Sequence, residues 1–390
     1  MNRIKQFRLA KGFSLDDLTQ AMGGIVTKQA VSKYERGLST PSAPVLNQLA
    51  GALGVKALEL LSEPSVAVRF IAYRKRTTFP KKEQNTLQAV VAQKLEERTR
   101  LQEYCFSSTQ FDLPIEQIPV FNEQDAERAA GQIREQWHLG LDPIANLTAI
   151  LEDHLVHVIQ LEAPEKFDGM SAIAEDQDKN PKAAAVVSRL GCPGDRQRLN
   201  LAHELAHLVM KPFPSVDEEK AAFRFAGAFL APRPTIEREV GTKRTSVRIE
   251  ELLILKQRFG MSVQALLMRL SDLQIISPTS FKWAWIHLSK LNWRKQEPLP
   301  LQPEKPEWLR QAALRCFAEG FISQEEAERL ADQKLGQKGA PGSLRRPAFL
   351  KLPIEERRRI LEEQAEQLHK HYEQDQSWRE VQGGDVLDYE

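Results

Sequence analysis

The middle of the chain contains the run Asn200-Leu-Ala-His203-Glu204-Leu-Ala-His207-Leu-Val209, which is the most informative stretch for both structure and chemistry. It contains no Gly or Pro, and its apolar residues recur at helical spacing, so it predicts one uninterrupted helix. A separation of four residues places His203 and His207 on one face, where both imidazoles can bind one tetrahedral zinc ion. Glu204 lies about 100° further round the helix, which suits a base that activates water beside the metal. These residues predict the active site of a zinc peptidase.

A catalytic zinc site needs a third protein ligand and one open position. The segment 217–232 predicts a second helix, with carboxylates in its first turn and a Pro beyond its end. Glu218 and Glu219 are both candidates for the third ligand. The apolar positions three, six and seven residues after Glu219 place its carboxylate on the core-facing side, whereas Glu218 points more toward solvent. We therefore expect Glu219 to complete the site.

Other interpretations of this site stay open. The two histidines could lie on a helix surface by chance, and Glu219 could belong to a solvated helix start. A site that holds zinc without hydrolysis is the more serious alternative. Glu204 separates the last case from a peptidase, because a pure binding module has no use for a base beside the zinc.

The first 62 residues have the pattern of a DNA-binding helix-turn-helix domain. Their apolar residues recur in about five short blocks, and Ser14 and Thr27 are natural N-caps of the second and third. Residues 1–60 hold eight Lys or Arg and four Asp or Glu, and this net charge of +4 suits a polyanionic partner. A small helical protein-binding domain of similar shape is the alternative.

The third block is the expected recognition helix. Val31 faces inward, and polar side chains near the N-terminal half can reach base edges in the major groove of double-stranded DNA. Gln suits adenine and Lys suits guanine, whereas two further basic residues are better placed for phosphates. The expected base contacts are Lys28, Gln29, Ser32 and Lys33, and the expected phosphate contacts are Arg36 and Lys5.

The composition is that of a globular protein with two or three folded units. The chain has 390 residues, of which 42% are hydrophobic and 27% charged, with a net charge of +1. No stretch approaches the roughly 18–20 apolar residues that cross a bilayer, and no secretion signal follows the basic N-terminus. Three cysteines far apart argue against a disulfide framework. We therefore expect a cytoplasmic protein with no membrane partner.

The expected organisation is multidomain. Alternating β-branched residues at 156–161 and two further short segments, at 169–174 and 183–188, predict a small sheet before the metal helix. The expected units are a helix-turn-helix domain at 1–62, a basic linker and helix at 63–122, a zinc metallopeptidase domain at 123–294, a helical extension at 295–335, a linker at 336–349 and an acidic helical interaction tail at 350–390.

The tail predicts an amphipathic helix followed by an acidic, aromatic end. Residues 354–390 hold eleven Asp or Glu and five Lys or Arg, a net charge of −6, so this end should avoid DNA. Its composition suits folding on a partner. The segment resembles the toxin-binding tails of bacterial antitoxins, which implies a toxin partner for residues 350–390. A solvated helix with a disordered end is the alternative.

Two further resemblances cover most of the chain. Residues 3–61, with Glu35-x-Gly37 and Leu49-Ala-x-x-Leu53-Gly-Val, resemble the Xre or lambda-repressor-like family. Three blocks, at 196–208, 219–232 and 258–270, resemble the ImmA/IrrE metallopeptidases over roughly residues 65–330.

The ImmA/IrrE resemblance implies His203, His207 and Glu219 as zinc ligands and Glu204 as the catalytic base. It also implies sequence-specific repressors as substrates. This sequence departs from the family at Ala206, where the family usually has Gly, and at Leu199, where it often has Phe. Neither departure touches the metal chemistry, but Ala206 adds a methyl group near a close helix contact.

The sequence thus predicts an all-α helix-turn-helix head, an α+β zincin-like metallopeptidase domain with a small sheet, and an α-helical C-terminal region. The favoured function is a DNA-binding zinc endopeptidase that regulates transcription by cleaving a repressor or another regulatory protein. The alternative is a non-catalytic antitoxin-type repressor that uses the peptidase fold as a sensor or docking module. A homodimer is plausible, because helix-turn-helix proteins commonly occupy paired half-sites.

Overall fold

The computed structural model describes residues 2–75, 80–105, 115–165, 167–293, 296–335 and 353–374. The chain falls into two units, Met1–Trp308 and Leu309–Glu390, and each is described by itself. The predicted linker at 336–349 lies outside the described residues, as does the predicted tail apart from 353–374.

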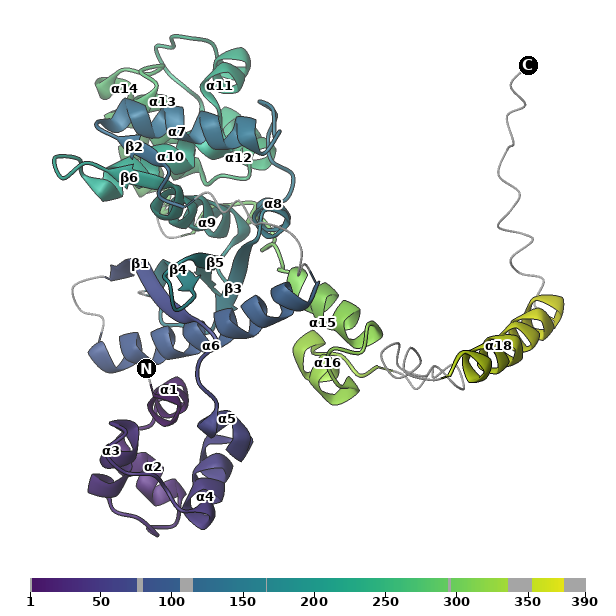
Figure 1. The fold of residues 1–390 in the computed structure, drawn as a ribbon. Coiled ribbons are helices and arrows are strands. Elements are labelled where there is room, and N and C mark those ends of the chain that lie inside the picture. The colour runs from purple at the N-terminus through teal and green to yellow at the C-terminus, as the bar shows by residue number, and fades with distance from the viewer. Residues whose placement is uncertain are drawn as a thin grey trace. The chain divides into compact units, whose positions relative to one another are not determined.

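The first 61 residues form a head of five short helices, as the spacing of apolar residues predicts (Figure 1). Ser14 accepts a hydrogen bond from Asp17 N, and Thr27 accepts one from Ala30 N, so both predicted N-caps are confirmed. The core of the head includes Val31, which is fully buried. The helices are α1 (Arg3–Ala10), α2 (Leu15–Ala21), α3 (Lys28–Glu35), α4 (Ala43–Leu53) and α5 (Ala57–Leu61).

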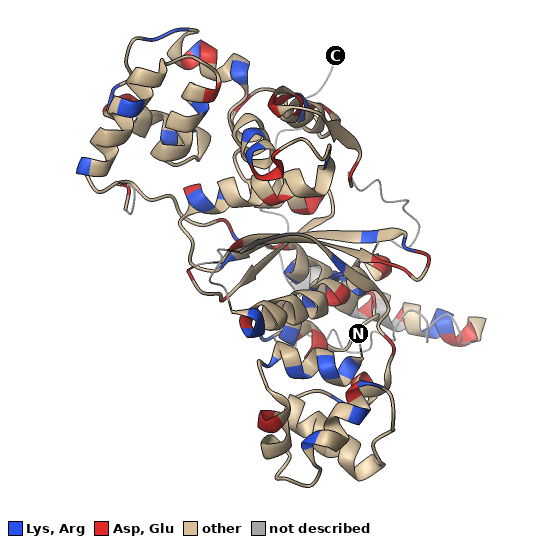
Figure 2. Ribbon diagram, turned by 90° about the vertical axis from the view of Figure 1, so that its left-hand side faces the viewer, with Lys and Arg blue, Asp and Glu red and all other residues tan. Residues whose placement is uncertain are grey.

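A four-stranded mixed sheet lies at the centre of the next part of the unit, in the order β1-β4-β5-β3. Its strands pair antiparallel, except that β3 and β5 are parallel. Figure 2 shows the middle strands largely without charged residues, and the central residues of β4 and β5 are buried on both faces. The strands are β1 (Ala67–Lys75), β3 (Val156–Leu161), β4 (Phe167–Glu175) and β5 (Pro181–Arg189).

Two long helices cover the two faces of this sheet (Figure 1). Helix α6 (Lys81–Cys105) packs Leu87, Val91 and Leu95 against one face. Helix α9 (Gly194–Val209), which carries the two histidines, packs against the other. The metal helix is therefore held between the sheet and the helices beyond it.

Residues 63–122 were predicted to form a basic linker and a helix, and strand β1 lies in the part expected to be the linker. Val68 and Phe70 pack against the cluster beneath α6, while Arg69 points outward and pairs with Glu175 on the neighbouring strand at 2.6 Å. Neighbouring residues thus lie on opposite faces, as in a strand. We interpreted the segment as a linker because of its basic residues, Arg69, Arg74 and Lys75.

The remaining elements of this unit build the wall on the far side of α9. A parallel ribbon joins β2 (Ile118–Val120) to β6 (Met210–Pro212), directly after the metal helix. The helices are α7 (Glu123–Gln136), α8 (Leu147–Asp153), α10 (Glu218–Leu230), α11 (Arg233–Val240), α12 (Ile249–Phe259), α13 (Val263–Asp272) and α14 (Pro278–Lys290). Most of them contribute to one large apolar core, together with α9.

Residues 296–307 form an extended strap that is bound tightly to this core. Glu297 pairs with the fully buried Lys256 at 2.9 Å, and Glu304 pairs with Arg198 at 2.6 Å. Gly194 lets the strap pass close to the start of α9, since a Cβ there would lie 2.3 Å from the Gln302 carbonyl oxygen. The strap therefore helps to fix the N-terminal end of the metal helix.

The described residues of the second unit are largely helical. They are α15 (Trp308–Ala318), whose first residue closes the first unit, α16 (Gln324–Ala331) and α18 (Ile354–Gln374). Among the residues that the structure describes, no helix in either unit is long and apolar enough to span a membrane. The multidomain fold class with a helical C-terminal region is confirmed.

Candidate metal centre

Helix α9 buries its chemistry-bearing residues almost completely. Leu201 and Leu205 anchor it in the core, and each is fully buried. His203 and Glu204 have no exposed surface, and His207 is 3% exposed. Burying polar side chains in this way costs free energy unless they are paired or bind an ion, so the position itself points to a specific role.

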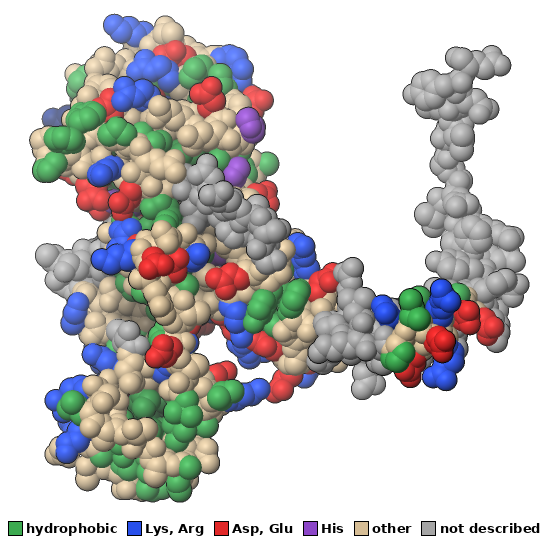
Figure 3. Space-filling view, viewed as in Figure 1, with side chains coloured by type: hydrophobic (Ala, Val, Ile, Leu, Met, Phe, Trp, Pro, Cys, Tyr) green, Lys and Arg blue, Asp and Glu red, His purple; other side chains and the backbone are tan. Residues whose placement is uncertain are grey.

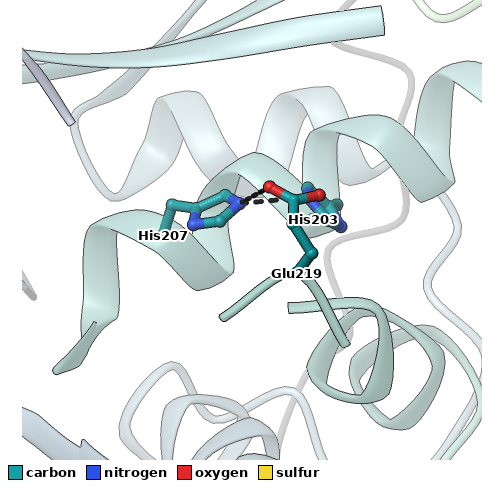
Figure 4. A group of neighbouring side chains, drawn as sticks. All are labelled: His203, His207 and Glu219. Atoms are coloured by element: carbon teal, nitrogen blue, oxygen red, sulfur yellow. Dashed lines mark hydrogen bonds and ion pairs between the residues drawn. The ribbon is translucent and has the colours of Figure 1, made fainter. Parts of the chain in front are cut away.

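Three side chains converge at one point on this helix (Figure 4). The Nε2 atoms of His203 and His207 lie 3.0 Å apart. Glu219, from the first turn of α10, faces both, with one carboxylate oxygen 3.5 Å from Nε2 of His203 and the other 3.6 Å from Nε2 of His207. All three ligand atoms lie within 4.8 Å of one another, and no other such group occurs in the described ranges.

This donor set fits a tetrahedral metal ion. With metal–ligand bonds of about 2.0–2.1 Å, the edge between two ligand atoms of a tetrahedron is about 3.3 Å, close to the separations found here. Two imidazoles and one carboxylate are the ligand types of a catalytic zinc site, which leaves one position for a substrate or water. The three residues therefore suit a metal of this kind.

Glu218 was the alternative third ligand, and its place differs from that of Glu219. The two side chains are almost equally exposed, at 54% and 53%, so burial does not distinguish them as we had argued. Their positions do distinguish the two residues. A carboxylate oxygen of Glu218 lies 3.1 Å from Nδ1 of His207, on the ring edge away from His203.

The carboxylate of Glu204 lies against strand β4. A Cβ atom built at Gly169 would stand 2.6 Å from Oε1 of Glu204, so only glycine leaves room for this side chain. The preceding residue, Asp168, ties the strand to α9, since its carbonyl accepts from Asn200 at 3.0 Å and its carboxylate pairs with Arg196 at 2.7 Å. We did not predict the role of Gly169 from the sequence, although a glycine within a strand can mark a close approach.

The metal centre is open on the side of α10. Glu219 is half exposed, and Phe223, one turn further along α10, is 44% exposed with its ring centroid 4.5 Å from that of His203. A partly exposed aromatic side chain therefore lies beside His203.

The nearby histidines of strand β3 and helix α8 do not belong to this site. His157 is fully buried and its Nε2 lies 2.9 Å from Oε1 of Gln102. Burial lowers the pKa of His157 well below its ordinary value, and the nearby charge of Arg98 lowers it further. His154 stacks on Trp137 with ring centroids 4.2 Å apart.

The predicted DNA-contacting residues lie on the surface of the head. Gln29, Lys33 and Arg36 are exposed and Ser32 is half-buried, while Lys28 pairs with Asp16 at 2.5 Å. Basic side chains line the edge of the head where α3 lies in Figure 1, as Figure 3 shows. Lys5 is exposed on α1, so its predicted phosphate contact comes from another helix.

Family comparisons match both parts of the first unit. Residues 4–60 match the helix-turn-helix family model, and residues 193–271 match the model of the IrrE N-terminal-like domain, which is a peptidase family. A search of curated proteins finds no match.

The fold and the family matches fit a DNA-binding regulator that carries a metallopeptidase-type domain. The chain is an N-terminal helix-turn-helix domain fused to an ImmA/IrrE-type domain, as the sequence resemblance implied. The matched part of the second domain contains α9, α10, α12 and most of α13, and thus all three candidate ligands.

Proposed function

We propose that this protein is a zinc-dependent endopeptidase that binds an operator through its head and regulates transcription by cleaving a regulatory protein. The observation that carries the proposal is the convergence of His203, His207 and Glu219 beside the buried Glu204. A repressor is the favoured substrate class, because the ImmA/IrrE-type domain is joined to a DNA-binding head.

Different residues would bind the metal ion and transfer the proton. His203, His207 and Glu219 would hold the zinc ion, which supplies Lewis acidity when bound. Glu204 acts as general base toward the attacking water and returns the proton to the leaving amine. Gly169 leaves room for the Glu204 carboxylate against β4, and the contacts of Asp168 hold this strand to α9.

Operator recognition is assigned to α3. Gln29 and Lys33 are proposed to read base edges, and Arg36 and Lys5 are proposed to hold phosphates. Their exposure supports this assignment. A toxin partner for residues 350–390, a homodimer and a cytoplasmic location stay predictions from the sequence.

The proposal is tested by metal analysis and cleavage. Mass spectrometry of the purified chain should find bound zinc, and incubation with repressors encoded by neighbouring genes should yield one pair of fragments that a chelator abolishes. If zinc is bound and the operator is protected, but no candidate is cut, the non-catalytic repressor with a docking or sensing peptidase fold is the better account.

A further inference from the structure

The contact between Glu218 and His207 has no role among the ligands or the base. A carboxylate oxygen of Glu218 lies 3.1 Å from Nδ1 of His207, while Nε2 of the same ring faces His203 and Glu219. The two ring nitrogens thus face different partners. An imidazole that donates from Nδ1 must present the lone pair of Nε2 on the opposite edge.

We propose that Glu218 is a positioning residue that fixes the orientation and tautomer of His207 for metal binding. The carboxylate accepts the Nδ1–H bond, so Nε2 is kept unprotonated and directed at the metal position. A negative charge on the outer edge also raises the basicity of the ring as a ligand. The inference rests on the proposed metal site and assigns Glu218 a task distinct from that of Glu219.

The backbone places this contact. Asp217 caps α10 by accepting from Lys220 N at 3.1 Å, so Glu218 is the first residue of the helix. Consecutive residues on a helix diverge by about 100°, which lets Glu218 and Glu219 reach opposite edges of the same imidazole. If Glu218 were to bind the metal and Glu219 to contact Nδ1 of His207, helix α10 would have to rotate about its axis.

The experiment measures zinc affinity by competition with a chromophoric chelator, with Glu218→Ala as the main variant. Loss of the carboxylate should weaken zinc binding about 10- to 100-fold, the usual effect of removing such a partner. It should also shift the visible absorption of the cobalt-substituted protein, because the His207 ring is free to reorient. Glu218→Gln keeps an oxygen that accepts from Nδ1, so its affinity should lie between those of the wild type and Glu218→Ala.

Asp217→Asn is the matched control. It removes one negative charge from the same helix start, and Asn caps a helix as well as Asp does, but it does not touch His207. Zinc affinity in this variant should stay within about threefold of that of the wild type. This change is smaller than the loss of affinity expected for Glu218→Ala, which removes the partner of His207. The melting temperature of the metal-free protein checks that Glu218→Ala still folds.

Two failures are distinguishable. If the wild type binds no zinc or cobalt, the proposed metal site itself is wrong. If the wild type binds zinc and Glu218→Ala binds it equally tightly, with an unchanged cobalt spectrum, the metal site stands and the positioning role of Glu218 is overturned. A loss of affinity as large in Asp217→Asn as in Glu218→Ala would also overturn it, because charge alone would then explain the effect.

Discussion

At the scale of single residues, neighbours in the sequence have separate tasks. Glu204 follows His203 directly, yet it faces Gly169 of the sheet while His203 faces Glu219 of α10. Sequence spacing was enough to predict the helix and the two histidines on one face, because both follow from helical geometry. Spacing could not reveal Gly169, since its contact with Glu204 spans 35 positions of the chain and depends on how the sheet packs.

Gly169→Ala tests the fit of the catalytic base. The added methyl would collide with the end of the Glu204 side chain, which is fully buried and has little room to move. We expect the carboxylate to shift and cleavage to fall by about 10- to 100-fold, since a misplacement of about 1 Å can cost that much. Zinc content, measured by mass spectrometry, should not change.

Gly131→Ala provides the control for this substitution. A Cβ at that position on α7 meets nothing within 4 Å, so cleavage should remain at the wild-type rate. Equal rates for the two variants would mean that Glu204 does not depend on the close approach of β4.

DNA recognition gives a second test at this scale. Gln29→Ala should cost about 1–3 kcal/mol and relax specificity at one operator position, because a base contact is lost. Lys5→Ala should weaken binding to all sequences alike and reduce its salt dependence, because a phosphate contact is lost. Footprinting over a panel of operators measures both. An unchanged sequence preference in Gln29→Ala would mean that α3 has been misassigned as the reader.

At the scale of elements, helices and strands with a clear apolar pattern could be predicted from the sequence. Elements that mix apolar residues with basic or aromatic ones could not. The helices of the head were predicted from apolar residues at helical spacing, and the strands β3, β4 and β5 from short runs of mostly apolar residues. Strand β1, at a sheet edge, has basic residues on either side of an apolar run at 70–73, and we interpreted its charge rather than its apolar residues. Helix α14 was missed, although Ser277 caps it and Pro278 opens it, because its three aromatic residues blur the polar face.

His157 on strand β3 should make the free energy of unfolding depend on pH. The pKa of His157 is lowered by burial, so the folded chain keeps a neutral imidazole, whereas the unfolded chain takes up a proton below about pH 6.5. The free energy of unfolding should therefore fall as the pH drops below about 6.5, by up to about 1.4 kcal/mol per pH unit.

Urea denaturation between pH 7.5 and 5 would measure this pH dependence, with about six pH values giving the slope. Metal-free protein should be used, so that loss of zinc does not add to it. His157→Gln cannot take up the proton, and its stability should depend less steeply on pH over this range. Parallel curves for the two proteins would show that His157 does not carry the effect.

At the scale of the whole molecule, the proposed DNA-binding and peptidase functions can be tested separately. The head and the metal centre use different residues, so a change at Glu204 should leave operator binding intact. The head also contacts α6, where Arg3 donates to Glu96 at 2.6 Å. The family matches could be anticipated from motifs, whereas the strap at 296–307 could not, because its fit depends on buried partners such as Lys256.

The central claim is that Glu204 performs proton transfer while Glu219 holds the metal. The most direct measurement compares zinc content and substrate cleavage in the wild type, Glu204→Gln and Glu219→Ala, each dialysed without chelator. Glu204→Gln keeps its shape but cannot accept a proton, so zinc should stay and cleavage should stop. Glu219→Ala removes a ligand, so zinc and cleavage should be lost together, with some loss of stability. Cleavage at the wild-type rate by Glu204→Gln, or full zinc retention by Glu219→Ala when Glu218→Ala loses it, would contradict this account.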